Sequence, residues 1–219
     1  MIDITDFINN DIKPLRTNDT IATAQDLFAE YPFSHFPVIE NNVYIGAANA
    51  EDTELMDIEK KIDENRFSFG RFFVRDTTIW LDVLEAFAKN ETNIMPILDN
   101  NNTYLGYYEI GDIIRFFHET PFLKENGGIL VVEKNMLEYS MSEAAQIVES
   151  NNGKLLGLFI SEANLEKVQI TLKINMGGLS EIIQTFRRYN YEIISEHQED
   201  TYLNTLKDRS DYLDKYLNI

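Results

Sequence analysis

Residues 93–114 read NIMPILDNNNTYLGYYEIGDII, and this stretch decides the fold. Residues 94–98 are an apolar run broken by a proline, and residues 104–108 are a second run of aromatic and apolar side chains. The Asp and Asn residues at 99–102 are typical of a turn, because their side chains bond the local backbone and tolerate a left-handed φ. The stretch therefore predicts two strands joined by a polar turn. Gly106 lies inside the second strand, where a glycine often marks the close approach of another backbone.

The same unit occurs earlier in the chain. Residues 33–48 contain an apolar run with a proline, a polar turn and a second strand with a glycine. The matched residues are Thr20 and Thr78, Pro37 and Pro96, Gly46 and Gly106, and Asp52 and Asp112. Their separation grows only from 58 (78 − 20) to 60 (106 − 46), as expected for a duplicated unit with small loop insertions.

Apolar residues at helical spacing predict a helix before and after the strands of each copy. The preceding helices have apolar faces at Ala24, Leu27, Phe28 and Tyr31, and at Trp80, Val83, Leu84 and Phe87. The closing helices have apolar faces at Leu55, Ile58 and Ile62, and at Ile110, Ile113, Ile114 and Phe117. Asp112 lies off the last of these faces.

This pattern resembles the tandem repeat of the CBS domain family, the regulatory module named after cystathionine β-synthase, in which each repeat is a βαββα unit. The resemblance covers residues 1–121, with repeats at about 12–62 and 72–118. It implies a lead-in helix at residues 2–10, packed on the first repeat. A cluster of aromatic residues between the repeats, at Phe67, Phe69, Phe72 and Phe73, is interpreted as packing of the connection rather than as a binding platform.

The resemblance also implies an adenine nucleotide, AMP, ADP or ATP with or without Mg²⁺, bound between the repeats. The residues that it assigns to this ligand are Asp52, Asn49, Phe36, Pro37, Asp112, Met95, Pro96 and Thr78. In the family the Asp holds the ribose hydroxyls, and a Ser or Thr three residues after the glycine contacts phosphate. This chain has Asn49 and Glu109 in place of that hydroxyl residue.

Asn49 and Glu109 differ in what they can offer a phosphate. The Asn49 amide carries N–H donors, whereas an ionised Glu109 only accepts hydrogen bonds. At ~4 Å and an effective dielectric near 20, its repulsion of a phosphate charge is about 4 kcal/mol before screening. We therefore expect weak nucleotide binding, at the first repeat rather than the second. Arg75 is the candidate cation that would offset Glu109.

The second half of the chain has a different pattern. Its apolar runs and helical faces predict the order β-α-β-β-α-β over residues 128–200, a ferredoxin-like arrangement, after a linker at 124–128. Ser142 is expected to cap the first helix, and Gly177-Gly178 to open the second. A last helix is expected at 201–219. The fold class predicted for the whole chain is α+β.

The second half resembles the ACT domain, which follows CBS pairs in proteins similar to acetoin-utilisation regulators. ACT domains bind small effectors, usually amino acids, at a glycine-bearing turn after the first strand. The corresponding loop, residues 133–139, contains no glycine, whereas a backbone that must approach a carboxylate closely favours one. We therefore expect this half to have kept only a role in assembly.

Composition and charge exclude several functions. The chain has 219 residues, with 19 Lys and Arg against 37 Asp and Glu, so its formal net charge is −18. Such a surface repels phosphate backbones and anionic lipids, and we expect no nucleic-acid and no membrane partner. The chain has no cysteine, which excludes disulfides and thiolate sites. The first ten residues lack the regions of a signal peptide, so a cytoplasmic location is expected.

No catalytic constellation is recognised in the sequence, and we expect neither an enzyme nor a metal site. His35, His118 and His197 lie in different predicted elements without partners at ligand spacing. The sequence favours a non-catalytic regulatory module that senses a small metabolite, forms a homodimer and acts on an unknown protein partner. The alternative is a structural or scaffold protein that dimerises and whose ligand sites are degenerate.

Overall fold

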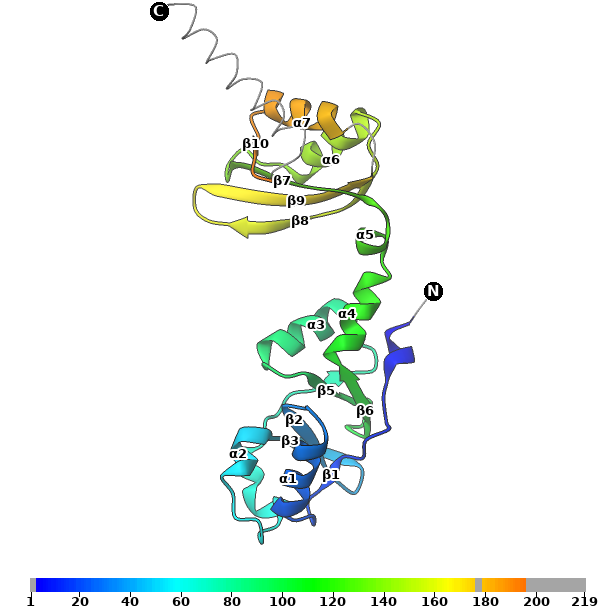
Figure 1. Ribbon diagram of the computed structural model, residues 1–219, viewed down its shortest axis with the longest axis vertical. Helices are drawn as coiled ribbons and strands as arrows, with labels where there is room; N and C mark the ends of the chain where they lie inside the picture. Colours follow the sequence, from blue (N-terminus) through cyan, green and yellow to red (C-terminus); the bar gives the residue numbers. More distant parts are fainter. Residues whose placement is uncertain (1–2, 176–178, 196–219) are drawn as a thin grey trace, which may run out of the picture. The chain divides into compact units, whose positions relative to one another are not determined.

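The computed structural model describes residues 3–175 and 179–195. The chain divides into two compact units, Met1–Glu119 and Thr120–Ile219 (Figure 1). Within the described residues, no helix has the length and apolar character needed to cross a membrane.

The first unit contains two copies of the same set of elements, each built around a three-stranded sheet. The first copy and its flanking turns comprise η1 (Ile4–Phe7), β1 (Leu15–Arg16), α1 (Ile21–Glu30), β2 (His35–Glu40), β3 (Val43–Asn49), α2 (Ala50–Glu54) and η2 (Ile62–Ser68). The second comprises β4 (Val74–Arg75), α3 (Trp80–Lys89), β5 (Ile94–Leu98), β6 (Tyr104–Glu109) and α4 (Ile110–His118). The βαββα duplication predicted from the sequence is confirmed.

The two sheets match in register. Val38 pairs with Leu15 and Gly46, and Ile97, which lies 59 residues later (97 − 38), pairs with Val74 and Gly106. In both sheets the register shifts immediately after this residue. The strand pairing was therefore duplicated together with its irregularity.

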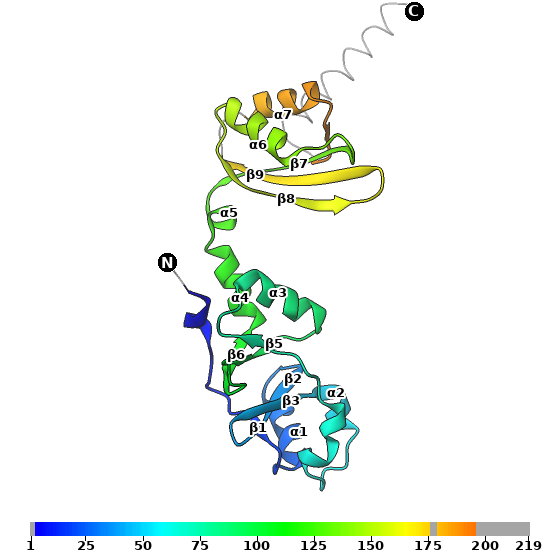
Figure 2. The same cartoon turned by 180° about the vertical axis from the view of Figure 1, so that it is seen from behind.

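The residues before each repeat cross to the other repeat, and we call them the lead-in segments (residues 3–14 and 69–73). Asn9 pairs with Tyr107 in β6, and Gly70 pairs with Ala47 in β3. Figures 1 and 2 show the first lead-in segment, in blue, beside α4 and β6. A Cβ atom on Gly106 would lie 2.5 Å from the carbonyl oxygen of Asn9, and its φ is +152°. The close approach predicted at this glycine is confirmed.

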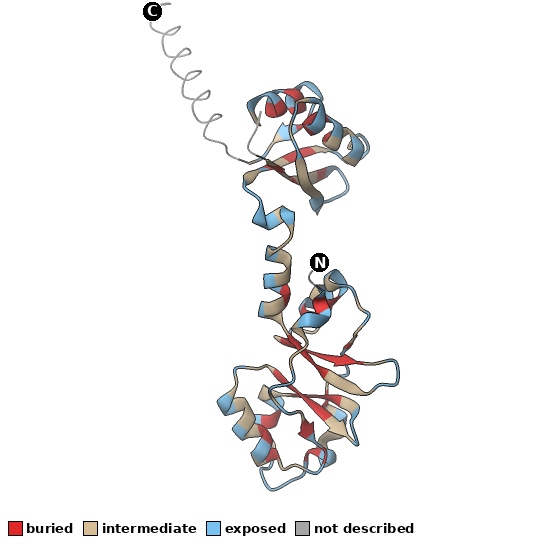
Figure 3. Ribbon diagram, turned by 90° about the vertical axis from the view of Figure 1, so that its right-hand side faces the viewer, coloured by how far each residue is buried: buried red, intermediate tan, exposed pale blue. Residues whose placement is uncertain are grey.

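Each repeat has its own apolar core (Figure 3). The faces predicted for α1 and α3 pack into these cores as expected. The prediction for the lead-in helix was wrong in two respects. Its helical part is only the 3-10 turn η1, and Ile4, Phe7 and Ile8 pack on the second repeat. The pairing of Asn9 with β6 is the physical reason, because it draws the segment onto the second repeat.

The closing helix of the first repeat is shorter than the apolar spacing predicted. α2 ends at Glu54, Leu55 is 89% exposed, and Ile62 is buried in η2 instead. The intervening residues turn towards α1, where the carbonyl oxygens of Ile58 and Lys60 accept hydrogen bonds from the first turn of that helix. They thereby satisfy N–H groups that have no partner within a helix. In α4, Ile114 is 57% exposed, so the predicted buried face of that helix was wrong at this residue.

The aromatic cluster between the repeats is divided. Phe69 is buried in the first core and Phe72 packs against the second, as predicted. Phe67 is 86% exposed, so the packing interpretation was wrong for this residue.

The second unit is a four-stranded antiparallel sheet with α6 and α7 on one face (Figures 1 and 2). Its elements are α5 (Pro121–Lys124), β7 (Gly127–Asn135), α6 (Met141–Ser150), β8 (Leu155–Ala163), β9 (Lys167–Asn175), α7 (Leu179–Arg188) and β10 (Glu192–Ile193). The strand order is β10-β7-β9-β8. The element order β-α-β-β-α-β is as predicted.

Two local predictions for the second unit were wrong. Ser140, not Ser142, caps α6, because its side chain accepts the N–H of Glu143. The predicted linker at 124–128 instead ends α5 and begins β7, where Gly127 and Gly128 pair with β9. Gly177, Gly178 and the helix expected at 201–219 lie outside the described residues.

Candidate functional site

The two candidate ligand positions lie where the last strand of each repeat meets the following helix. We call Asn49 with Asp52 the first-repeat motif, and Glu109 with Asp112 the second-repeat motif. Asn49 pairs with His35 across β2 and β3, and Glu109 pairs with Ile94 across β5 and β6. Each Asp lies in the first turn of its helix. The duplication therefore gives both motifs the same backbone frame.

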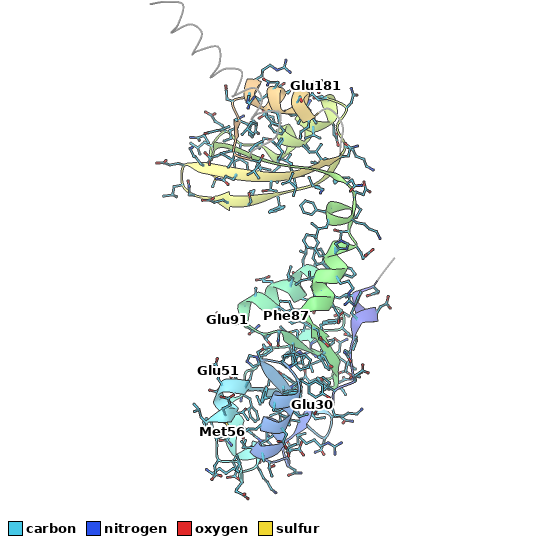
Figure 4. The ribbon with its side chains drawn as sticks, viewed as in Figure 1. Glu30, Glu51, Met56, Phe87, Glu91 and Glu181 are labelled. Carbon is cyan, nitrogen blue, oxygen red and sulfur yellow. The ribbon has the colours of Figure 1, made fainter. Side chains whose placement is uncertain are left out.

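In the first-repeat motif, Asn49 caps α2. Its Oδ1 accepts the N–H of Glu51 at 2.8 Å and that of Asp52 at 3.3 Å, and Figure 4 labels Glu51. This arrangement makes Nδ2 the donor to His35 Nε2, at 3.1 Å. Nδ2 carries a second hydrogen, so the amide keeps a donor for a ligand. The Asp52 side chain is exposed beside this cap.

His35 connects the first-repeat motif to the second repeat. Burial lowers the pKa of His35 and the Asp52 charge opposes the shift, so the ring is neutral at neutral pH. Its Nδ1 lies 2.9 Å from Ser34 Oγ, which in turn donates to Asn93 Oδ1 at 3.1 Å. A proton on Nδ1 and none on Nε2 satisfies every contact. A chain of side-chain hydrogen bonds thus runs from Asn49 to Asn93.

The second-repeat motif is built differently. Glu109 makes no side-chain cap on α4, and its Oε1 instead accepts from Asn9 Nδ2 at 3.3 Å. Asp112 forms an ion pair with Arg115 at 3.2 Å. Ile94, in place of His35, is apolar and buried. The polar chain of the first repeat therefore has no counterpart here.

Arg75 does not neutralise Glu109. Its guanidinium donates to the carbonyl oxygen of Asp99 and, at 2.7 Å, to Asn102 Oδ1, and it lies over the Phe73 ring. These contacts hold the β5–β6 turn. The offsetting role expected for this residue is therefore wrong.

The other residues that the resemblance assigned to the ligand have the following positions. Phe36 and Met95 occupy equivalent positions, and their side chains are buried in the first and second cores. Pro37 and Pro96, which follow them, are also buried. The Thr78 hydroxyl accepts the N–H of Arg75 at 2.9 Å and lines a separate cavity with Trp80. Hydrogen bonds join Asn49 to the backbone of Asp52 and to His35, a residue that the resemblance did not assign to the ligand.

Sequence reasoning missed the part played by Ser34 and Asn93. They occupy equivalent positions, 59 residues apart (93 − 34), and the Ser34 N–H donates to Asn93 Oδ1 at 2.9 Å. Asn93 Nδ2 donates to the carbonyl oxygen of Pro32 at 2.7 Å. The available signal was the polar residue immediately before each apolar proline strand.

Comparison with known protein families agrees with the fold of the first repeat. Residues 4–53 match the family model described as the CBS domain. No curated protein matches the chain.

Solved structures that are similar to this chain include the following three. A CBS domain pair/ACT domain protein from Thermotoga maritima is 18% identical, with 54% of this chain and 98% of that chain covered and a TM-score of 0.49. The CBS domains of a transcriptional regulator from Streptococcus pneumoniae are 22% identical, with 52% and 98% covered and a TM-score of 0.47. The protein CBSX2, in complex with AMP, is 17% identical, with 53% and 96% covered and a TM-score of 0.46. The family match over the first repeat, with the same strand register in the second, identifies the first unit as a CBS domain pair.

Proposed function

We propose that the first unit is a non-catalytic regulatory module that binds an adenine nucleotide at the first-repeat motif. The observation that carries this proposal is the difference between the two motifs. Asp52 is exposed beside an amide that retains an N–H donor, whereas Asp112 is paired with Arg115 and the second-repeat motif has the carboxylate of Glu109 in place of that amide. A ribose needs paired acceptors and a phosphate needs donors, and the first-repeat motif offers both.

The hydrogen-bond chain gives this proposal a route for regulation. A phosphate that draws on the Asn49 amide competes with its contact to His35. His35 is held by Ser34, and Ser34 is held by Asn93 of the other repeat. Ligand binding at one motif would thus change the contact between the two repeats, which is the conformational signal that a protein partner would detect.

Isothermal titration calorimetry of the full chain with AMP, ADP and ATP, each with and without Mg²⁺, tests the proposal. Asp52→Asn should weaken binding at least about tenfold, because it removes charge-assisted bonds to the ribose. Asp112→Asn is the matched control and should change the affinity by less than about twofold. A loss caused by Asp112→Asn and not by Asp52→Asn would reverse the assignment.

The scaffold alternative is favoured by a specific observation. Aromatic rings lie near both motifs. The centres of the Phe72 and His35 rings are 5.1 Å apart, and the centres of the Phe33 and Tyr107 rings are 5.7 Å apart. Rings at these positions compete with a purine for the same space. If no nucleotide binds even at about millimolar concentration, the scaffold function replaces the sensing function.

For the second unit we propose an ACT-like role in assembly of a homodimer, without capture of free amino acids by its first loop. Lys134, at the start of that loop, supports the absence of amino-acid capture, because its side chain is a largely buried cation. Its ammonium pairs with Glu143 at 2.8 Å and lies 4.3 Å from the centre of the Tyr191 ring. The Lys134 ammonium and the Glu143 carboxylate are therefore paired with each other and are not available to bind the carboxylate and ammonium groups of an amino acid.

Calorimetry of the full chain with the common amino acids, and sedimentation at tens of micromolar protein, test these two statements. We expect no amino-acid binding and a dimer mass. Micromolar binding that is lost on changing Asn135 or Met136 would contradict the first statement, and a monomer mass would contradict the second.

A further inference from the structure

A cavity of about 510 Å³ lies in the first unit, and none of the four motif residues lines it. Its walls come from η1, from the start of α3 and from the end of α4. The side chains that matter below are Asp3, Thr5, Asp76, Ile79, Trp80 and Phe116. A volume of this size is within the range of small-molecule sites.

The cavity carries negative charge. Asp3 and Asp76 line it, and its lining contains no Lys, Arg or His. A hydrogen bond from the backbone N–H of Thr5 holds the pKa of Asp3 below its usual value, so this carboxylate is ionised at neutral pH. The amino end of α3 adds only about half a positive charge. Two carboxylates outweigh it, so the cavity favours a cation.

Two buried polar atoms near the cavity have no hydrogen-bond partner among the described residues, and one of them, Asp76 Oδ1, can only accept when ionised. The other is the hydroxyl oxygen of Tyr108. Burial, together with the charges of Asp3 and Asp76, raises the pKa of Tyr108 to about 12. Buried polar atoms usually have partners. A ligand that donates hydrogen bonds would supply what the protein lacks here.

The apolar side of the cavity is aromatic. The Trp80 ring is tilted against Phe116, with ring centres 5.7 Å apart, and is stacked on Phe117 at 5.1 Å. These contacts hold the indole in place. An indole face is the best aromatic partner for a cation and also packs well against methylene groups.

We propose that this cavity binds a small alkylammonium ion, with its ammonium group between Asp3 and Asp76 and its carbon chain against Trp80 and Phe116. The site shares no lining residue with either motif. The proposal of amine binding can therefore be tested independently of the proposal of nucleotide binding.

Trp80 makes the test direct, because it is the only tryptophan in the chain. Its fluorescence should change and saturate when the full chain is titrated with 1,4-diaminobutane or butylamine. Tetramethylammonium, which has the charge but no N–H donor, should bind more weakly. Butyrate, with a similar carbon chain and a negative charge, should give no change.

A matched pair of variants separates this site from general attraction to a chain of net charge −18. Asp76→Asn should weaken diamine binding at least about tenfold. Asp82→Asn removes the same charge from an exposed position on α3 and should change binding by less than about twofold. If Asp76→Asn does not fold, Asp3→Asn takes its place with the same expected direction.

Three results would overturn the inference. These are a fluorescence change that never saturates, an equal loss for Asp76→Asn and Asp82→Asn, and a response to butyrate that matches the response to butylamine.

Discussion

The two repeats of the first unit share their strand register but differ in the side chains placed on it. In the first repeat, His35 lies opposite Asn49, and a polar chain reaches Asn93. In the second, Ile94 lies opposite Glu109, whose carboxylate accepts from Asn9. The backbone pairing depends on continuous runs of buried residues within the strands and on one glycine in each copy, so it tolerates changes at the strand ends. Function can therefore differ between repeats whose folds match.

The largest effect is expected at the glycines that accept the crossing lead-in segments. Gly106→Ala should destabilise the first unit by about 3 kcal/mol, because it combines a clash with Asn9 and an unfavourable φ. Gly46→Ala meets Phe69 and should cost about 2 kcal/mol. Urea unfolding followed by Trp80 fluorescence measures both.

Gly111 provides the control for these glycine variants, because a Cβ there meets nothing within 4 Å. Gly111→Ala in α4 should stabilise by about 0.5 kcal/mol through its helix propensity. Equal losses at all three glycines would contradict the role assigned to the lead-in segments.

Making the first repeat resemble the second at its polar chain should have the next largest effect. His35→Ile copies Ile94 and leaves Asn49 Nδ2 and the Ser34 hydroxyl short of a partner, so we expect a loss of about 2 kcal/mol. His118→Gln, at an exposed position, is the control and should change little. If His35→Ile is neutral in urea unfolding, the polar chain does not stabilise the pair.

A smaller effect is expected from pH. The folded pKa of His35 is depressed below the unfolded value of 6.5, mainly by burial. Below pH 6.5 the unfolded chain therefore binds more protons at His35 than the folded chain does. The free energy of unfolding is unaffected by His35 titration above that pH, and it decreases as the pH falls below it. Urea unfolding at pH values from 7.5 to 5 gives the slope of the unfolding free energy against pH. His35→Gln should reduce this slope, and an unchanged slope would exclude His35 as its source.

The helix caps give the next comparison. Asn49→Ala removes the cap of α2 and should cost about 1 kcal/mol, whereas Glu109→Asn gives α4 a capping side chain and should gain about 0.5 kcal/mol. Thermal unfolding of the two variants measures both changes. If Glu109→Asn gives no gain, Glu109 already stabilises the start of α4 through its hydrogen bond with Asn9.

The smallest effect is expected at the Asp112–Arg115 ion pair. Arg115 is exposed, so Arg115→Ala should cost about 0.3 kcal/mol. High salt should reduce this difference further, since exposed charges are screened. A cost above about 1 kcal/mol would show that the pair has a structural role that its exposure does not indicate.

Much of the fold could be predicted because its signals are local. The turn at Asp99–Asn102, the faces of α1 and α3, and the close contact at Gly106 each follow from a few neighbouring residues. The end of α2 could not be predicted, because tertiary hydrogen bonds to α1 outweigh the apolar spacing of Leu55, Ile58 and Ile62.

The candidate site was predicted less completely. The resemblance to the CBS family assigned Asn49 and Asp52 to the ligand. Their link to the second repeat depends on the register that places His35 opposite Asn49, and on the contact of Ser34 with Asn93. Neither follows from local pattern. Resemblance placed Phe36 and Met95 at the ligand, although both side chains are buried in the cores.

The crossing of the lead-in segments sets an order of events during synthesis. Gly70 pairs with a residue made 23 positions earlier (70 − 47), whereas Asn9 must wait for a residue 98 positions later (107 − 9). At the usual rate of translation that wait is roughly 5–20 s. The first sheet gains its crossing segment early and from nearby in the chain. The second sheet gains its crossing segment only when β6 has been synthesised. A segment made early in synthesis therefore completes the sheet that is made last in the first unit.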